Sequence, residues 1–137
     1  MKIKLNPVSS TVKGKRVVMI DDSIVRGTTS ARIVKLVREA GATEVHMRVS
    51  APPFTNPCYY GTDIDSKESL IACHYSIEEI ARHIGVDSLG YLEIPSLQEL
   101  TGSCHYCDAC FTGKYPTAVP VNTEKNRFEQ KISERKR

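Results

Sequence analysis

The pattern of apolar and polar positions in the first half of the chain predicts one strand–helix–strand unit. Residues 16–20 form a short apolar run, Arg-Val-Val-Met-Ile, which is typical of a strand buried on both faces. Apolar side chains then recur at helical spacing between Ser30 and Ala40, and Gly41 is a good residue to end that helix. A second strand is predicted over Glu44–Val49. Because parallel strands need a crossover, we expect a right-handed βαβ unit.

The second half has fewer regular elements. Ala51–Gly61 contains three prolines and predicts a loop. The segment Ser76–Gly85 opens with a capping-box pattern and ends in glycine, so it predicts a short helix. A third strand is predicted over Ser88–Ile94, and a brief helical turn over Pro95–Leu100. After Pro120 the chain is polar and charged, and no order is expected there. The pattern as a whole indicates an α/β fold.

Length and charge narrow the possible functions. A chain of 137 residues with 40% hydrophobic residues is long enough for one domain. The net charge is +3, but residues 1–16 hold five basic and no acidic residues, and residues 122–137 hold six basic and three acidic ones. Positive charge in two polar ends does not indicate a nucleic-acid partner. No apolar run approaches the roughly 18 residues of a membrane span, and no secretory signal is present, so we expect no membrane partner and a cytoplasmic protein.

The segment Val17–Ser30 carries the most chemistry. A strand ends at Asp21 and Asp22, a short polar loop follows, and a helix begins at Thr28–Ser30. A helix start binds anions through its unpaired backbone N–H groups and its positive dipole, and Gly27 allows the backbone to approach a phosphate closely. The three hydroxyls at the helix start add neutral donors. This segment therefore predicts a phosphate site.

The acidic pair changes that prediction. Asp21 and Asp22 repel each other and would oppose a phosphate, unless the ligand also brings hydroxyls or a divalent cation. Carboxylates accept hydrogen bonds from sugar hydroxyls and bind Mg²⁺. A sugar phosphate offers a phosphate to the helix start and hydroxyls to the acidic pair. The alternative is a solvated acidic cap at the start of the helix.

Five cysteines, an odd number, cannot all pair within the chain. Three of them lie within Cys104–Cys110, at a spacing that suits a metal site or plain reduced thiols better than a disulfide framework. Zinc would need further ligands, which Cys58, His74 or His105 offer. An iron–sulfur cluster also takes cysteine thiolates. The spacing does not separate these alternatives.

Three segments carry a resemblance to a known family. Val18–Ser30, reading VMIDDSIVRGTTS, resembles the phosphoribosylpyrophosphate (PRPP) signature of type I phosphoribosyltransferases, and more narrowly that of the glutamine PRPP amidotransferase family. Ala51–Gly61 (APPFTNPCYYG) and Cys107–Pro116 (CDACFTGKYP) resemble the same family. The resemblance implies a partial type I phosphoribosyltransferase fold, with a parallel sheet and flanking helices, followed by a cysteine-containing segment. We expect three parts: a C-terminal portion of that domain over 1–100, a cluster-binding segment over 101–121, and a polar, disordered tail over 122–137.

The resemblance also implies the roles of the site residues. The acidic pair would contact the ribose hydroxyls and hold Mg²⁺, and the following turn would wrap the 5′-phosphate. The implied PRPP-binding residues are Asp21, Asp22, Ser23, Arg26, Gly27, Thr28, Thr29 and Ser30. One branch of the family carries a [4Fe–4S] cluster, whose ligands match Cys58, Cys107 and Cys110, with the fourth ligand outside this chain. Cys73 and Cys104 are expected to be inert thiols.

By this resemblance, the chain is part of an enzyme that transfers glutamine-derived ammonia to PRPP. The products are 5-phosphoribosylamine and pyrophosphate, in the first step of de novo purine synthesis. The implied partners are PRPP, nucleoside monophosphates and, through a glutaminase domain that this chain lacks, glutamine; the intact enzyme would be a homo-oligomer. We interpret the chain as a C-terminal fragment that holds no catalytic residue and is inactive alone. Two alternatives remain: a non-catalytic PRPP-binding regulatory module, and a small metal or iron–sulfur interaction domain.

Overall fold

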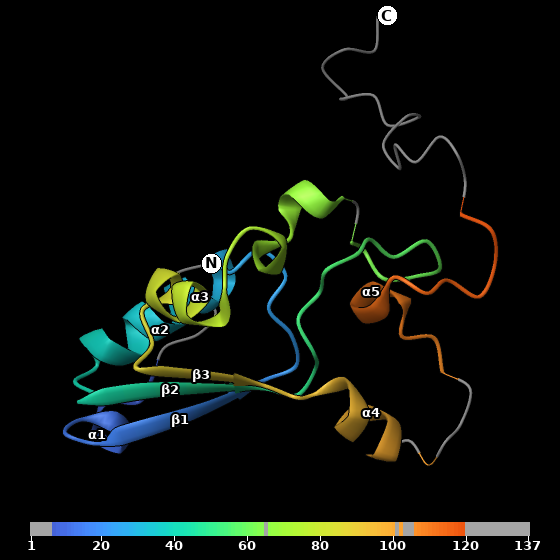
Figure 1. Cartoon of the computed structure of the whole chain (residues 1–137). Coiled ribbons are helices and arrows are strands. Elements are labelled where there is room, and N and C mark those ends of the chain that lie inside the picture. Colours follow the sequence, from blue (N-terminus) through green and yellow to red (C-terminus); the bar gives the residue numbers. More distant parts are fainter. Residues whose placement is uncertain (1–6, 65, 101, 103–105, 120–137) are drawn as a thin grey trace, which may run out of the picture.

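The computed structural model describes residues 7–64, 66–100, 102 and 106–119. Three parallel strands form one sheet in the order β1 (Arg16–Asp21), β2 (Glu44–Val49) and β3 (Ser88–Tyr91) (Figure 1). The expected α/β fold with a parallel sheet is therefore confirmed. The third strand is shorter than predicted, because helix α4 already begins at Ile94. Cys104, His105 and the tail over 122–137 lie outside the described residues.

The described helices are α1 (Ser9–Val12), α2 (Thr28–Glu39), α3 (Ile77–Ile84), α4 (Ile94–Leu100) and α5 (Ala109–Thr112), with 3-10 turns at Lys67–Ser69 and Ile71–Cys73. Of these, α2 and α3 pack against the sheet and cover one of its faces. Helix α2 crosses over from β1 to β2, and α2 and α3 lie on the same side of the sheet (Figure 1). Among the described residues, no helix has both the length and the apolar character needed to cross a membrane.

Helix α3 has the predicted ends. The backbone N–H of Glu79 donates to Ser76 Oγ at 3.3 Å, and the backbone N–H of Ser76 donates to the Glu79 carboxylate at 2.8 Å. These bonds satisfy two N–H groups that the first turn would otherwise leave open. Gly85 ends the helix with φ of 82°, a left-handed conformation that glycine adopts without strain. The capping box read from the sequence is thus confirmed.

Two hydrophobic clusters hold the molecule together. The first, the sheet cluster, lies between the sheet and helices α2 and α3; its buried members are Ile24, Val34, Val37, Val45, Met47, Val49, Ile71, Ile80, Ile84 and Val86. The second, the loop cluster, is built from Phe54, Ile64 and Leu70, with Val25, Cys58, Cys110 and Phe111 packed against it. The loop cluster joins the segment after β2 to helix α5, which lie side by side in Figure 1.

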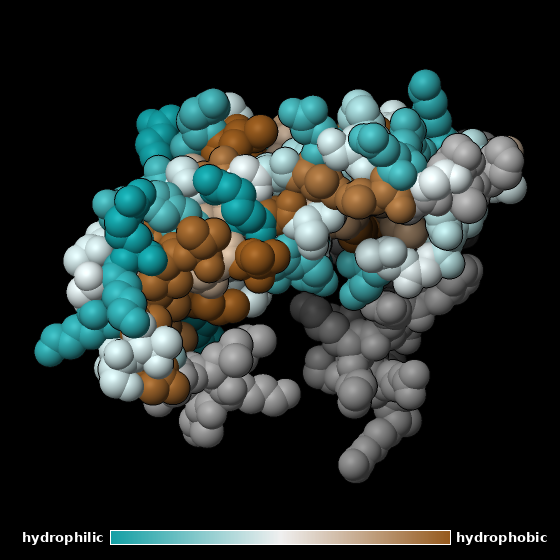
Figure 2. All heavy atoms as spheres, turned by 90° about the horizontal axis from the view of Figure 1, so that it is seen from below, coloured by the Kyte–Doolittle hydropathy of each residue, from teal (hydrophilic) through white to brown (hydrophobic). Residues whose placement is uncertain are grey.

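The other face of the sheet is open, which corrects the expectation of a strand buried on both faces. Val18 and Ile20 of β1 are 60% and 80% exposed, because α2 and α3 cover the opposite face and no described element covers this one. On the same face His46 lies between Ser88 Oγ and the Glu44 carboxylate, 2.9 Å from each. Figure 2, which views the molecule from below the sheet, shows hydrophobic residues gathered beside hydrophilic ones.

Candidate functional site

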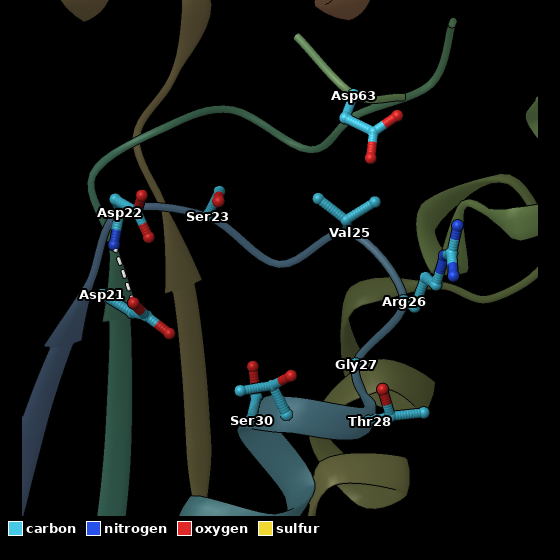
Figure 3. A pocket seen from close by; sticks show the side chains of 10 residues that line it. Asp21, Asp22, Ser23, Val25, Arg26, Gly27, Thr28, Ser30 and Asp63 are labelled. Atoms are coloured by element: carbon cyan, nitrogen blue, oxygen red, sulfur yellow. Dashed lines mark hydrogen bonds between the residues drawn. The ribbon is translucent and has the colours of Figure 1, made fainter. Parts of the chain in front are cut away.

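A pocket of about 480 Å³ lies where the loop after β1 leads into helix α2 (Figure 3). It lies at the carboxyl end of a parallel strand, where open α/β sheets bind their ligands. The pocket is lined by Asp21, Asp22, Ser23, Val25, Arg26, Gly27, Thr28, Thr29, Ser30 and Asp63. The structure therefore brings together all eight residues that the sequence singled out, and adds Val25 and Asp63.

The loop is anchored in both hydrophobic clusters, although its sequence was expected to be polar throughout. Ile24 is 2% exposed and belongs to the sheet cluster. The next side chain, Val25, packs against the loop cluster, and its carbonyl accepts a hydrogen bond from the Ile71 N–H at 2.9 Å. Adjacent side chains thus point into different cores, and this fixes the backbone that approaches the ligand.

The start of α2 has the geometry of an anion site. Gly27 is the N-cap, with φ of 76°, and its carbonyl accepts the first helical hydrogen bond from the Ala31 N–H at 2.9 Å. The N–H groups of the first turn have no acceptor within the helix and are available to a ligand. Since Gly27 is the cap, Asp21 and Asp22 do not serve as a solvated acidic cap, and that alternative is excluded.

The acidic pair is electrostatically unfavourable without a ligand. Burial raises the pKa of the Asp21 carboxyl, and the neighbouring Asp22 carboxylate raises it further, although the Asp22 N–H donates to Asp21 Oδ1 at 3.0 Å. A cation beside the two carboxylates would relieve this repulsion. Mg²⁺ is often bound by one or two carboxylates together with phosphate oxygens and water. The donor chemistry of the pair therefore suits Mg²⁺.

Asp63 is a pocket residue that the sequence did not reveal. It lies in the loop after β2, and in Figure 3 its carboxylate is turned toward the loop at Val25, across the pocket from Thr28 and Ser30. Its position depends on how the segment after β2 folds back onto the loop between β1 and α2. No spacing rule connects it to the acidic pair, so the sequence carried no signal for it.

Two of the three cysteines expected to bind a cluster lie in the loop cluster. Burial disfavours the Cys58 thiolate, but the backbone N–H groups of Tyr60, Thr62 and Gly61 more than offset this and lower its pKa to about 7. Burial raises the pKa of the Cys110 thiol, and the nearby charges of Cys58 and Cys107 raise it further.

The four cysteines that the structure describes do not form a metal site among themselves. Cys58 and Cys110 are partly buried in the loop cluster, whereas Cys107 is exposed. Within the described residues, no group of three or more histidine, cysteine, aspartate or glutamate side chains is arranged to hold a metal ion. Cys73 is exposed, and its thiol donates to the Thr55 carbonyl at 3.3 Å.

The segment around α5 is attached firmly to the loop after β2. The N–H groups of Thr55 and Asn56 both donate to the Cys110 carbonyl at 3.0 Å. The Tyr115 hydroxyl donates to the Pro57 carbonyl at 2.7 Å, and the rings of Phe54 and Phe111 lie 4.9 Å apart, centroid to centroid. These contacts keep Cys110 next to the loop that carries Cys58.

Comparison with known proteins reveals similar proteins that carry the name amidophosphoribosyltransferase. The chain is 54% identical over 130 residues to the amidophosphoribosyltransferase of Synechocystis sp., and 56% identical over 119 residues to that of Methanocaldococcus jannaschii. These alignments cover 93% and 87% of this chain but only 26% and 25% of the relatives. The chain thus spans about a quarter of the length of the curated relatives it matches. No family model matches the sequence.

Solved structures agree with the sequence relatives. A glutamine PRPP amidotransferase from Bacillus subtilis, complexed with ADP and GMP, matches with a TM-score of 0.79 and 52% sequence identity, over 86% of this chain and 27% of that one. A structure described as the allosteric regulatory enzyme of purine biosynthesis matches with a TM-score of 0.80 at the same identity. Sequence and fold together make this chain a homologue of the amidophosphoribosyltransferases, over a phosphoribosyltransferase portion that is about a quarter of their length.

Proposed function

We propose that the pocket binds the ribose 5-phosphate part of PRPP. The observation that carries the proposal is the convergence of the Asp21–Asp22 pair and the glycine-capped start of α2 in one pocket. The N–H groups of the helix start and the hydroxyls of Thr28, Thr29 and Ser30 would hold the 5′-phosphate. Arg26 would complement its charge.

The acidic pair would bind the other half of the ligand. Asp21 and Asp22 would accept hydrogen bonds from the ribose hydroxyls and hold Mg²⁺. When bound, Mg²⁺ neutralises charge on the departing pyrophosphate. The residues of this chain would position the ribose so that C1 is open to attack, and this positioning is their contribution to the rate.

The reaction proposed for the whole protein is the transfer of glutamine-derived ammonia to PRPP, which gives 5-phosphoribosylamine and pyrophosphate. The names of the relatives support this assignment, and the remaining three quarters of such a protein would supply the glutaminase domain. Because the B. subtilis relative was solved with ADP and GMP, nucleoside monophosphates are proposed as further ligands of this chain. The full assembly would be a cytoplasmic homo-oligomer.

Cys58, Cys107 and Cys110 are proposed ligands of a [4Fe–4S] cluster, with a fourth ligand from outside this chain. Support comes from the shared loop cluster of Cys58 and Cys110, and from the electrostatic effect of Cys107 on Cys110. We propose residues 101–121 as the segment that carries two of these ligands, residues 1–100 as the phosphoribosyltransferase part and 122–137 as the tail. Iron and sulfide analysis of anaerobically prepared protein tests the cluster. Zinc, or no iron, would contradict it.

Calorimetric titration tests the sugar-phosphate site. Ribose 5-phosphate and PRPP, each with Mg²⁺, should bind the wild-type chain, and the double variant Asp21→Asn/Asp22→Asn should lose roughly 10-fold or more in affinity. A small metal-binding domain would show no binding and no effect of the double variant. A regulatory module would bind PRPP equally well but would also shift DNA in a salt-dependent manner.

A further inference from the structure

Asp63 is held over the pocket by its neighbours in the chain and not by its own side chain. Among the described residues, no group donates a hydrogen bond to the Asp63 carboxylate or pairs with it. The next residue, Ile64, is 1% exposed and forms part of the loop cluster. The backbone at Asp63 is therefore anchored, while its carboxylate remains available to a ligand.

Cys58 closes the loop that presents Asp63. The N–H of Cys58 donates to the Ile64 carbonyl at 3.0 Å, and the N–H of Thr62 donates to Cys58 Sγ at 3.4 Å. The residues on either side of Asp63 are thus both bonded to Cys58, one through its backbone and the other through its sulfur. A change at this sulfur would shift the loop at the position next to Asp63.

The loop cluster also supports Val25, a second pocket residue, which lies in the loop before α2. Val25 lines the pocket and packs against the same cluster as Ile64 and Cys58. Two pocket residues that are distant in sequence, Val25 and Asp63, therefore rest on one hydrophobic cluster. Their separation is set by the packing of that cluster.

We infer that Asp63 determines the pocket's selectivity for a phosphate that carries a sugar over a bare phosphate, and that Cys58 positions it. The inference rests on the proposed function of the pocket. A carboxylate accepts hydrogen bonds from hydroxyls and repels phosphate. Asp63 lies across the pocket from Thr28 and Ser30, where the phosphate would bind, so it faces the remainder of the ligand (Figure 3).

Calorimetry of the reduced chain with two probes, ribose 5-phosphate and inorganic phosphate, tests both roles. Asp63→Asn should weaken ribose 5-phosphate binding about 10-fold and leave phosphate binding unchanged or up to about 2-fold tighter. Cys58→Ala, which removes the acceptor for the Thr62 N–H, should weaken the sugar phosphate selectively by about 3-fold. Cys58→Ser keeps an acceptor for the Thr62 N–H and should weaken sugar-phosphate binding less than Cys58→Ala does. Cys73→Ala, a cysteine outside this loop, is the matched control.

A double-mutant cycle distinguishes positioning from an independent effect. If Cys58 acts through Asp63, adding Cys58→Ala to Asp63→Asn should cause no further loss. Any one of four results would overturn the inference. The losses of the two substitutions could be additive, or a variant could weaken the binding of both probes equally. Asp63→Asn could bind the sugar phosphate more tightly, or Cys58→Ser could bind it as weakly as Cys58→Ala does. Should Cys58→Ala not fold, the Cys58→Ser and Asp63→Asn proteins carry the test. A wild-type chain that binds no ribose 5-phosphate would instead refute the proposed function, and the inference with it.

Discussion

Gly27 lies directly against Ile71: a Cβ atom at Gly27 would be 2.6 Å from Ile71 Cδ1. Gly27 also has φ of 76°, a conformation that strains any residue with a side chain. The residue that caps α2 in the pocket is thus in contact with the sheet cluster. The shape of the loop between β1 and α2 and the packing of the sheet cluster therefore both depend on Gly27.

Gly27→Ala should therefore destabilise the fold and abolish phosphate binding together. Positive-φ strain and displacement of the Cδ1 end of Ile71 should together cost about 2 kcal/mol of unfolding free energy. Gly14→Ala is the control, because Gly14 has φ of 71° but no atom within 4 Å of a Cβ, so it should cost only about 1 kcal/mol. Urea denaturation compares the two variants, and equal losses would show that the clash contributes nothing.

Asp22→Asn should stabilise the ligand-free fold at pH 7 while it weakens Mg²⁺-dependent binding. The pKa of Asp21 is raised by burial and by Asp22, so ionisation of Asp21 destabilises the folded state once the pH exceeds that pKa. Replacing Asp22 removes the repulsion and should raise the melting temperature at pH 7. The difference in melting temperature between the two proteins should shrink as the pH falls and Asp21 becomes protonated. A melting temperature that drops at pH 7 would contradict this electrostatic account.

Cys58 should react with iodoacetamide as a low-pKa thiol. Its rate should be half-maximal near pH 7, because backbone N–H groups lower its pKa to about 7. Cys110, whose pKa is raised by burial and nearby charge, should react more slowly at that pH. Mass spectrometry of tryptic peptides separates the two sites. A Cys58 midpoint near the ordinary value of 9.0 would disprove the stabilised thiolate.

The same thiolate should contribute to stability in a pH-dependent manner. Since the pKa is lower in the folded than in the unfolded state, the contribution is complete above the ordinary value of 9.0 and is lost as the pH falls through about 7. The stability advantage of the wild type over Cys58→Ser should therefore shrink between about pH 9 and pH 6. Urea denaturation at several pH values measures it, and a constant difference would argue against the effect.

Two isoleucines of α3 offer a matched test of core packing. Ile80 is 1% exposed and belongs to the sheet cluster, whereas Ile77 is 42% exposed. Ile80→Ala should cost about 3 kcal/mol of unfolding free energy, from lost burial and the cavity left behind. Ile77→Ala should cost less than about 1 kcal/mol. Thermal and urea denaturation of both variants measure the loss of unfolding free energy. Similar losses for the two variants would contradict the packing of α3 described above.

The sequence predicted correctly those elements that depend on residues close together in the chain. The capping box at Ser76, the glycine stop at Gly85 and the strand Glu44–Val49 were all readable, because each depends on residues within a few positions of one another. The gathering of Asp21 with the start of α2 followed from the strand–loop–helix order alone.

The sequence did not predict features that depend on packing between segments far apart in the chain. Ile24 and Val25 looked like members of a polar loop, yet each is held by a different cluster. Asp63 reaches the pocket only because the segment after β2 folds back onto the loop before α2. The exposure of Val18 and Ile20 depends on which elements cover the sheet, and an apolar run does not reveal this.

The open side of β1 bears on how the chain behaves at high concentration. Within the described part of the chain, β1 is an edge strand of the sheet and carries two exposed aliphatic side chains, and such a strand is a template for an extended segment that meets it. Copies of the chain therefore have a route to self-association that becomes more prominent as concentration rises. A polypeptide that covers Val18 and Ile20 would remove these side chains from water and oppose self-association. The solubility of the chain therefore depends on whether another polypeptide covers this face of β1.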